Sequence, residues 1–215
     1  MTRQLYEMLG GAKDEQSGSR RIYGLVVGIV TNNQDPDGMG RIKVKFPWLN
    51  DNDESHWARV CSLMAGKERG AYFLPEVNDE VLLAFEQGDR RFPYVLGGLW
   101  NGKDSPPATN DGNNDIRLIK SRSGHVIRLN DKDGQETVEI IDKNGNSIKY
   151  DTADNSLTIT TKKDITLSAP QGTIALDARV IEIKSSTQTT LQAGSTMDMK
   201  ANATMNVKGA MVNIN

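Results

Sequence analysis

Residues 157–167 read LTITTKKDITL, in which an apolar–polar–apolar triplet occurs twice, separated by a short polar segment. Six further triplets follow at intervals of seven to nine residues, and the last covers residues 212–214. Fifteen of the sixteen flanking positions are aliphatic or Met, and only Thr189 departs. Because side chains alternate between the two faces of a strand, the flanking residues of each triplet share one face.

A repeat this short buries its apolar face only when neighbouring repeats stack on it. The pattern therefore predicts a β-solenoid or a fibre. The alternative is an ordinary meander of short strands, but a meander does not keep an even spacing over eight units. The only aromatic residue after Trp100 is Tyr150, which fits a thin core filled by Ile, Leu, Met and Val.

A single chain gains too little from this core to order it. Burial of one such side chain contributes roughly 1.5–3 kcal/mol, whereas ordering the backbone costs about 1–2 kcal/mol for every residue of the repeat. Three chains wound around one axis would share a core and close the sheet edges. We therefore expect an intertwined homotrimer with a triple-stranded β-helix, and the residues expected in its core are Leu157, Ile159, Ile165, Leu167, Ile174, Leu176, Ile181, Ile183, Leu191, Met197, Met199, Met205 and Val207.

The first hundred residues have a different composition and hold eleven of the twelve aromatic residues. Five strand-like runs are separated by turn-rich segments, including Asn50–Ser55 and Gly66–Gly70. In residues 41–46 apolar residues alternate with cations, as in a half-buried strand. The five runs are Arg21–Val30, Gly40–Phe46, His56–Leu63, Glu80–Glu86 and Pro93–Trp100. Five strands in about eighty residues predict an oligonucleotide/oligosaccharide-binding (OB) barrel. The expected all-β organisation is an N-terminal segment 1–20, an OB barrel 21–100, a linker 101–115, a β-hairpin neck 116–150 and the β-helix 151–215.

Several motifs along this barrel resemble one known family. They read DPDGMGRIKV at 35–44, FPW at 46–48, WARV at 57–60, GAYFLPEVNDEV at 70–81, PYVLGGLWNG at 93–102 and RLIKSRSGH at 117–125. In this order and spacing they resemble the baseplate protein V and VgrG spike family of contractile phage tails, tailocins and injection systems. The resemblance extends over about residues 20–215 and implies a trimeric spike, with three barrels joined to an outward-pointing β-helix.

Differences between this sequence and the family indicate which partners the protein binds. Only about twenty residues precede the barrel, so we expect the hub to be a separate protein at the barrel end. Its contact is expected at Leu5, Tyr6, Met8 and Leu9, unless this segment is a frayed terminus. The repeat continues in phase to the end, so the resemblance implies a PAAR-type tip protein that binds at Val212, Ile214 and Asn215.

The sequence shows no catalytic, cofactor or metal motif, and we expect no enzyme activity. Asp131-Lys132-Asp133-Gly134 begins like a calcium loop, but Glu136 replaces the required glycine. Together with Asn144-Gly145 it is better interpreted as a pair of hairpin turns. The two histidines, His56 and His125, are far from the C-terminus, which excludes the His-x-His iron site of some related tips. Cys61 has no partner cysteine, and we expect it in the core or at an interface.

Two functions remain open at this stage. The first is a structural central spike that sits under the baseplate hub, carries a tip protein and pierces the target envelope mechanically. It would be assembled in the cytoplasm within a phage-tail-like particle and would cross an envelope on contraction, since no signal peptide or membrane-spanning run is visible.

The second candidate function is that of an OB-fold nucleic-acid-binding protein with a trimerising tail. A net charge of −2 argues against nucleic acid, although Arg41, Lys43 and Lys45 form a short cationic row. A receptor-binding fibre would need a globular head after the repeat.

Overall fold

The structure, a computed structural model, describes residues 21–214, with the backbone alone at 50–53. Contacts divide the chain after Lys162 into two units. The described residues form an all-β fold, and their only helical element is the 3₁₀ turn η1, Glu86–Gly88. No helix within residues 21–214 has the length and apolar character needed to cross a membrane.

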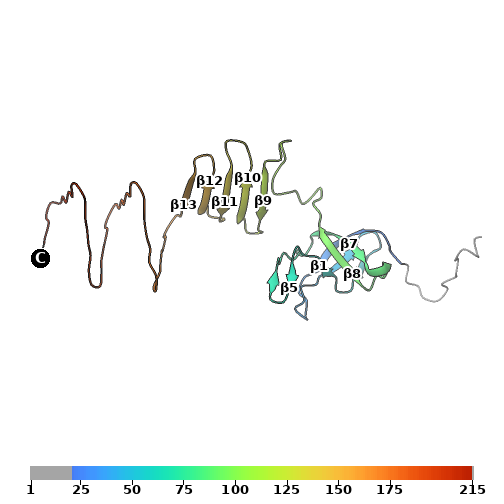
Figure 1. The fold of residues 1–215 in the computed structure, drawn as a ribbon. Helices are drawn as coiled ribbons and strands as arrows, with labels where there is room; N and C mark the ends of the chain where they lie inside the picture. Colours follow the sequence, from blue (N-terminus) through green and yellow to red (C-terminus); the bar gives the residue numbers. More distant parts are fainter. Residues whose placement is uncertain (1–20, 215) are drawn as a thin grey trace, which may run out of the picture. The chain divides into compact units, whose positions relative to one another are not determined.

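The OB-like domain of the first unit is a six-stranded sheet in the order β3-β2-β1-β7-β8-β4 (Figure 1). All its neighbouring strands are antiparallel except β4 and β8, which are parallel. A bridge between Ile42 and Ala58 links the residue before β2 to the residue before β4, so the sheet curls toward a closed barrel. The strands are β1 Val26–Asn32, β2 Lys43–Phe46, β3 Asn50–Glu54, β4 Arg59–Val60, β7 Glu80–Phe85 and β8 Pro93–Gly98, and a small hairpin is formed by β5 Ala65–Gly66 and β6 Arg69–Gly70.

Period-two alternation builds the core of this barrel. Every second residue of β2 and β7 is buried, while the residues between them are half-buried. Phe46 and Phe85, one from each of these strands, pack with ring centroids 5.9 Å apart. The core residues are Val30, Ile42, Val44, Phe46, Ala58, Val81, Leu83, Phe85 and Val95. The barrel therefore buries an apolar core with residues of one chain.

Two parts of the barrel differ from the sequence-based prediction. The segment Asn50–Ser55, expected to be a turn, contains strand β3, which pairs with β2. Glu54 at its end accepts hydrogen bonds from Lys43 Nζ and Thr31 Oγ1, both at 2.7 Å, so polar side chains fasten this edge strand. The expected strand from His56 to Leu63 is reduced to the two residues of β4.

A five-stranded antiparallel meander follows the barrel, in the order β13-β12-β11-β10-β9 (Figure 1). Its strands are β9 Ile116–Lys120, β10 Val126–Asn130, β11 Thr137–Ile141, β12 Ser147–Asp151 and β13 Ser156–Thr160. The hairpin turns predicted at Asp131–Gly134 and Asn144-Gly145 are confirmed, and Gly134 and Gly145 have positive φ values of 71° and 84°. Leu157 and Ile159, the first triplet of the repeat, lie in β13 of this sheet.

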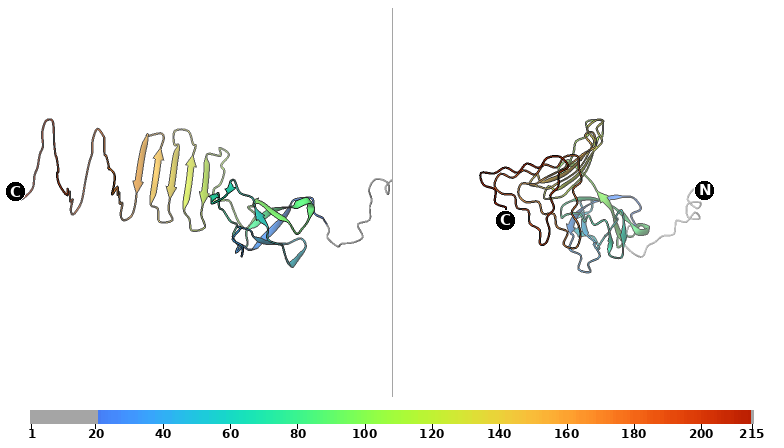
Figure 2. Two further views of the ribbon diagram at one scale, coloured as in Figure 1. Left: turned by 60° about the horizontal axis from the view of Figure 1, so that its bottom comes forward. Right: turned by 60° about the vertical axis from the view of Figure 1, so that its left-hand side comes forward.

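The second unit begins at Lys163 and contains no strand between residues 163 and 214 of this single chain. Figure 2 shows this segment running back and forth. The triple-stranded β-helix thus stays a prediction, because its strands would pair with other chains. The predicted start of the β-helix at residue 151 also stays a prediction for the assembled protein, whereas the single chain divides after Lys162.

Candidate functional site

One side of the β9–β13 sheet is a continuous apolar surface, which we call the apolar face. The cross-strand register aligns its residues in two rows. Their exposed fractions lie between 38% for Ile148 and 54% for Tyr150, so no other part of residues 21–214 covers them fully. The first row is Ile119, Ile127, Ile140, Ile148 and Ile159, and the second is Leu129, Val138, Tyr150 and Leu157, with Arg117 at its end.

The opposite side of the same sheet is mostly polar, with Ile116, Leu118, Val126 and Ile141 as its apolar members. We call it the polar side. Arg128 Nε donates to Glu139 Oε2 at 2.6 Å, and Lys149 Nζ contacts Asp151 Oδ2 at 2.8 Å. The hydrogen bond from Lys149 lowers the pKa of Asp151 and raises that of Lys149. Glu139 is only 8% exposed. The polar side is thus better buried than the apolar face, which is the reverse of a sheet in its final environment.

The predicted core residues of the second unit are also exposed in the single chain. From Ile165 to Val207 their exposed fractions range from 48% to 68%. The structure does not bring them together, so their convergence on a shared axis stays a prediction. Val212 and Ile214 of the expected tip contact are exposed too. Asn215 and the expected hub contact Leu5, Tyr6, Met8 and Leu9 lie outside the described residues.

The loop between β1 and β2, which carries the DPDGMGR motif, is organised by one carboxylate. Asp35 accepts backbone hydrogen bonds from Asp37, Met39 and Arg41 at 3.0–3.2 Å. Its two oxygens also accept from Arg41 Nη2 and Nε at 2.6 and 2.9 Å. These bonds, above all the one from the guanidinium, lower the pKa of Asp35 well below its ordinary value. The motif therefore has a structural role that fixes a turn of the barrel.

Three basic side chains of the barrel form ion pairs with carboxylates of the same domain. Besides Arg41, Lys43 pairs with Glu54 at 2.7 Å, and both cations lie over the Trp57 ring. Arg91 pairs with Asp89 at 2.6 Å and lowers the pKa of that carboxyl to about 2. Of the cationic row Arg41, Lys43 and Lys45, two members are thus neutralised by carboxylates. This weakens the case for a phosphate-binding surface.

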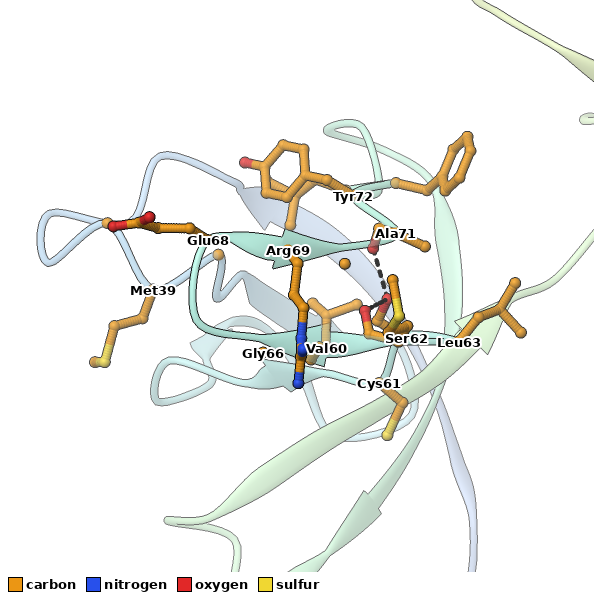
Figure 3. Close-up of a pocket in the computed structure, with 17 residues that line it drawn as sticks. Met39, Val60, Cys61, Ser62, Leu63, Gly66, Glu68, Arg69, Ala71 and Tyr72 are labelled. Carbon is orange, nitrogen blue, oxygen red and sulfur yellow. Dashed lines mark hydrogen bonds between the residues drawn. The ribbon is translucent and has the colours of Figure 1, made fainter.

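A second exposed apolar surface surrounds the β5–β6 hairpin, where a groove of about 750 Å³ opens (Figure 3). Ser62 Oγ donates to the carbonyls of Met64 and Ala71, at 3.1 and 2.5 Å, and fastens the base of the hairpin. Leu63, Met64, Tyr72 and Phe73 line the groove and are 55–98% exposed. This surface was not predicted from the sequence, although the apolar run AYFL at 71–74 indicates it.

Cysteine and histidine form no site in this barrel or sheet. Cys61 is exposed and also lines the hairpin groove. Its expected place in the core is therefore wrong, while a place at an interface stays a prediction. His56 and His125 are exposed. Within the described residues, no group of three His, Cys, Asp or Glu side chains is arranged to hold a metal ion.

Comparison with known proteins agrees with the motifs of the barrel. Residues 26–100 match the family model of the type VI secretion system/phage-baseplate injector OB domain. Over 116 residues the chain is 32% identical to the type VI secretion system spike protein VgrG1a of Pseudomonas aeruginosa, which covers 48% of this chain and 18% of the relative. It is 31% identical to VgrG5 of the same organism over 132 residues, or 55% of this chain and 17% of that protein. The aligned region is thus less than a fifth of either relative, and the resemblance to baseplate protein V and VgrG-type spikes is confirmed.

Proposed function

We propose that this chain is the structural central spike of a contractile injection machine, because residues 26–100 match the model of the type VI secretion system/phage-baseplate injector OB domain. The likeness to VgrG spike proteins supports a baseplate spike. The observation that carries the proposal further is the uncovered apolar face of β9–β13, followed by 52 residues whose apolar side chains find no cover in one chain.

Three copies of the chain would supply that cover. In a parallel homotrimer, three β9–β13 sheets turn their apolar faces toward one axis and leave their paired charges outside. The triplets that follow would continue the same core, since Ile148 and Ile159, neighbours across β12 and β13, align with the start of the repeat. Burial at roughly 25 cal/mol per Å² of apolar surface is the driving force. Intertwined strands would also leave few unpaired strand edges along residues 163–214.

We further propose that the role of this spike is mechanical, with no catalytic step, and that it crosses the target envelope when the parent tail contracts. A separate hub protein binds at the barrel end. A PAAR-type tip protein binds at Val212 and Ile214, whose apolar side chains are 48% and 92% exposed. A phage, a tailocin and an injection system all fit this description.

Light scattering on the purified full chain tests the assembly. We expect a particle of about three times the chain mass of 23.7 kDa with slow unfolding, since wound strands separate together. A folded monomer that retains its β-structure would contradict the proposal.

The tip contact is tested by pull-down of the cognate tip protein with the full chain and with a chain that lacks residues 210–215. We expect the shortened trimer to lose the tip protein. Equal capture by both chains would place the tip contact elsewhere.

A further inference from the structure

We propose that a second copy of this chain packs into an apolar groove that Leu63, Phe73 and Trp100 form beside strand β9. We call it the junction groove. This inference rests on the proposed trimeric spike and adds the barrel to the surfaces that hold the copies together. It assigns a role to barrel residues that lie outside the repeat and outside the barrel core.

The junction groove lies within the first unit and has a volume of about 820 Å³. Leu63, Phe73 and Trp100 line one part of it, and residues 118–122, which include the end of β9, line another. An ion pair between Arg122 and Glu76, at 2.9 Å, connects the two parts. The linker contributes Pro106 and Pro107, so most of the lining is apolar.

The apolar side chains on the barrel side of this groove are highly exposed to solvent. Leu63 is 98% exposed, Trp100 71% and Phe73 69%. In Figure 3 the Leu63 side chain points away from the β5–β6 hairpin and from the barrel. Single exposed apolar residues are common, but a cluster around one groove is typical of an interaction surface. Phe and Trp are also residue types that are enriched in protein–protein contacts.

Continuity with the apolar face identifies the occupant. Ile119 lines the junction groove and is also the first residue of the row Ile119, Ile127, Ile140 on the apolar face. A copy that packs on this row also contacts the junction groove, because Ile119 belongs to both. Two cations line the groove, Lys120 and Arg122, and Arg122 is paired with Glu76. One remaining cation is a small charge for the recognition of nucleic acid, which is bound through many phosphate contacts. A second copy of the chain is the occupant that the same interface already supplies.

Photocrosslinking in the full chain tests this inference. The variant Phe73→p-benzoylphenylalanine replaces one exposed aromatic side chain by another, and Phe92→p-benzoylphenylalanine is the matched control. Phe92 is 53% exposed on the same barrel, beside Arg91, and lines neither groove. After irradiation of the purified protein, we expect a covalent product of twice the chain mass from the Phe73 variant. The control should give at least tenfold less of this product.

The outcomes separate this inference from the proposed function. Light scattering on the same samples reports whether a trimer is present. A trimer whose Phe73 variant yields only single-chain products, or no more dimer than the Phe92 control, overturns the inference and leaves the spike intact. If tenfold dilution abolishes the dimeric product while light scattering still shows a trimer, the crosslinks come from collisions between particles. That result would also overturn the inference. A monomer without crosslinks would refute the proposed function itself.

Discussion

In the barrel, the apolar side of each strand faces other strands of the same chain, whereas in the β9–β13 sheet it faces no other part of residues 21–214. Leu83 and Val44 are fully buried, but Ile140 and Tyr150 are more than half exposed. Both regions use the same period-two alternation. The difference is closure, because the bridge from Ile42 to Ala58 links the start of β2 to the start of β4, and the meander has no such bridge. The barrel thus covers its own apolar core, whereas the apolar residues of the sheet and of residues 163–214 would be covered only in the proposed trimer.

The largest expected effect is loss of the trimer while the barrel stays folded. Met197→Asp would place three carboxylates close together in the trimer core, at a cost of several kcal/mol for each buried ion. Thr190→Asp, at the middle of a triplet, should change stability by no more than about 0.5 kcal/mol per chain. Sedimentation and limited proteolysis of the C-terminal segment measure the loss of trimer. Equal loss in both variants would mean that the alternation is assigned to the wrong faces.

The next effect is confined to the barrel. Leu83→Ala removes a fully buried side chain and should lower the free energy of unfolding of the barrel by about 2–5 kcal/mol. Val77→Ala, at a half-exposed site, should cost about 0.5 kcal/mol or less. Chemical denaturation of the full chain measures both, and the mass of the assembled particle should not change. A Leu83 variant that loses the trimer before the barrel unfolds would show that the two regions depend on each other.

A smaller effect tests whether the apolar face is covered. Ile140→Ala should cost about 2 kcal/mol or more per chain if other copies bury this side chain. Ile116→Ala is the matched control, since Ile116 pairs with Asn130 on the polar side of the same sheet and should cost about 1 kcal/mol or less. Thermal unfolding of the trimer compares the two. Equal shifts would indicate that the apolar face remains open to water.

The smallest effect depends on pH and on the barrel alone. The pKa of Asp35 and that of Asp89 lie below the ordinary value of 3.8 in the folded chain. The unfolded chain therefore takes up protons first as the pH falls, so the stabilisation is complete above about pH 5 and is lost between about pH 4 and pH 2. Asp35→Asn should lower Tm at pH 7 and flatten the fall of Tm over the acid range. Parallel Tm profiles for both proteins would contradict the role of the Asp35 carboxylate.

The features that were predicted correctly from the sequence depend on residues that are close together along the chain. The barrel strands that contain Val44 and Leu83 follow from alternation, and the turns at Gly134 and Gly145 follow from turn residues that allow positive φ. Strand β3 was missed because its residues are polar and only its pairing with β2 makes it a strand. The junction groove was missed for a related reason. Leu63, Trp100 and Ile119 come together only through the fold.

The meander of β9–β13 also has a consequence for the order of folding. Each of its strands pairs with the next one along the chain, so the sheet requires only short loops to close. Such local pairings form quickly, whereas contacts between chains depend on concentration. Each newly made chain should therefore present a finished apolar sheet before it meets its partners. That interval is when the chain is most prone to aggregate, and chains made close together on one messenger RNA would shorten it.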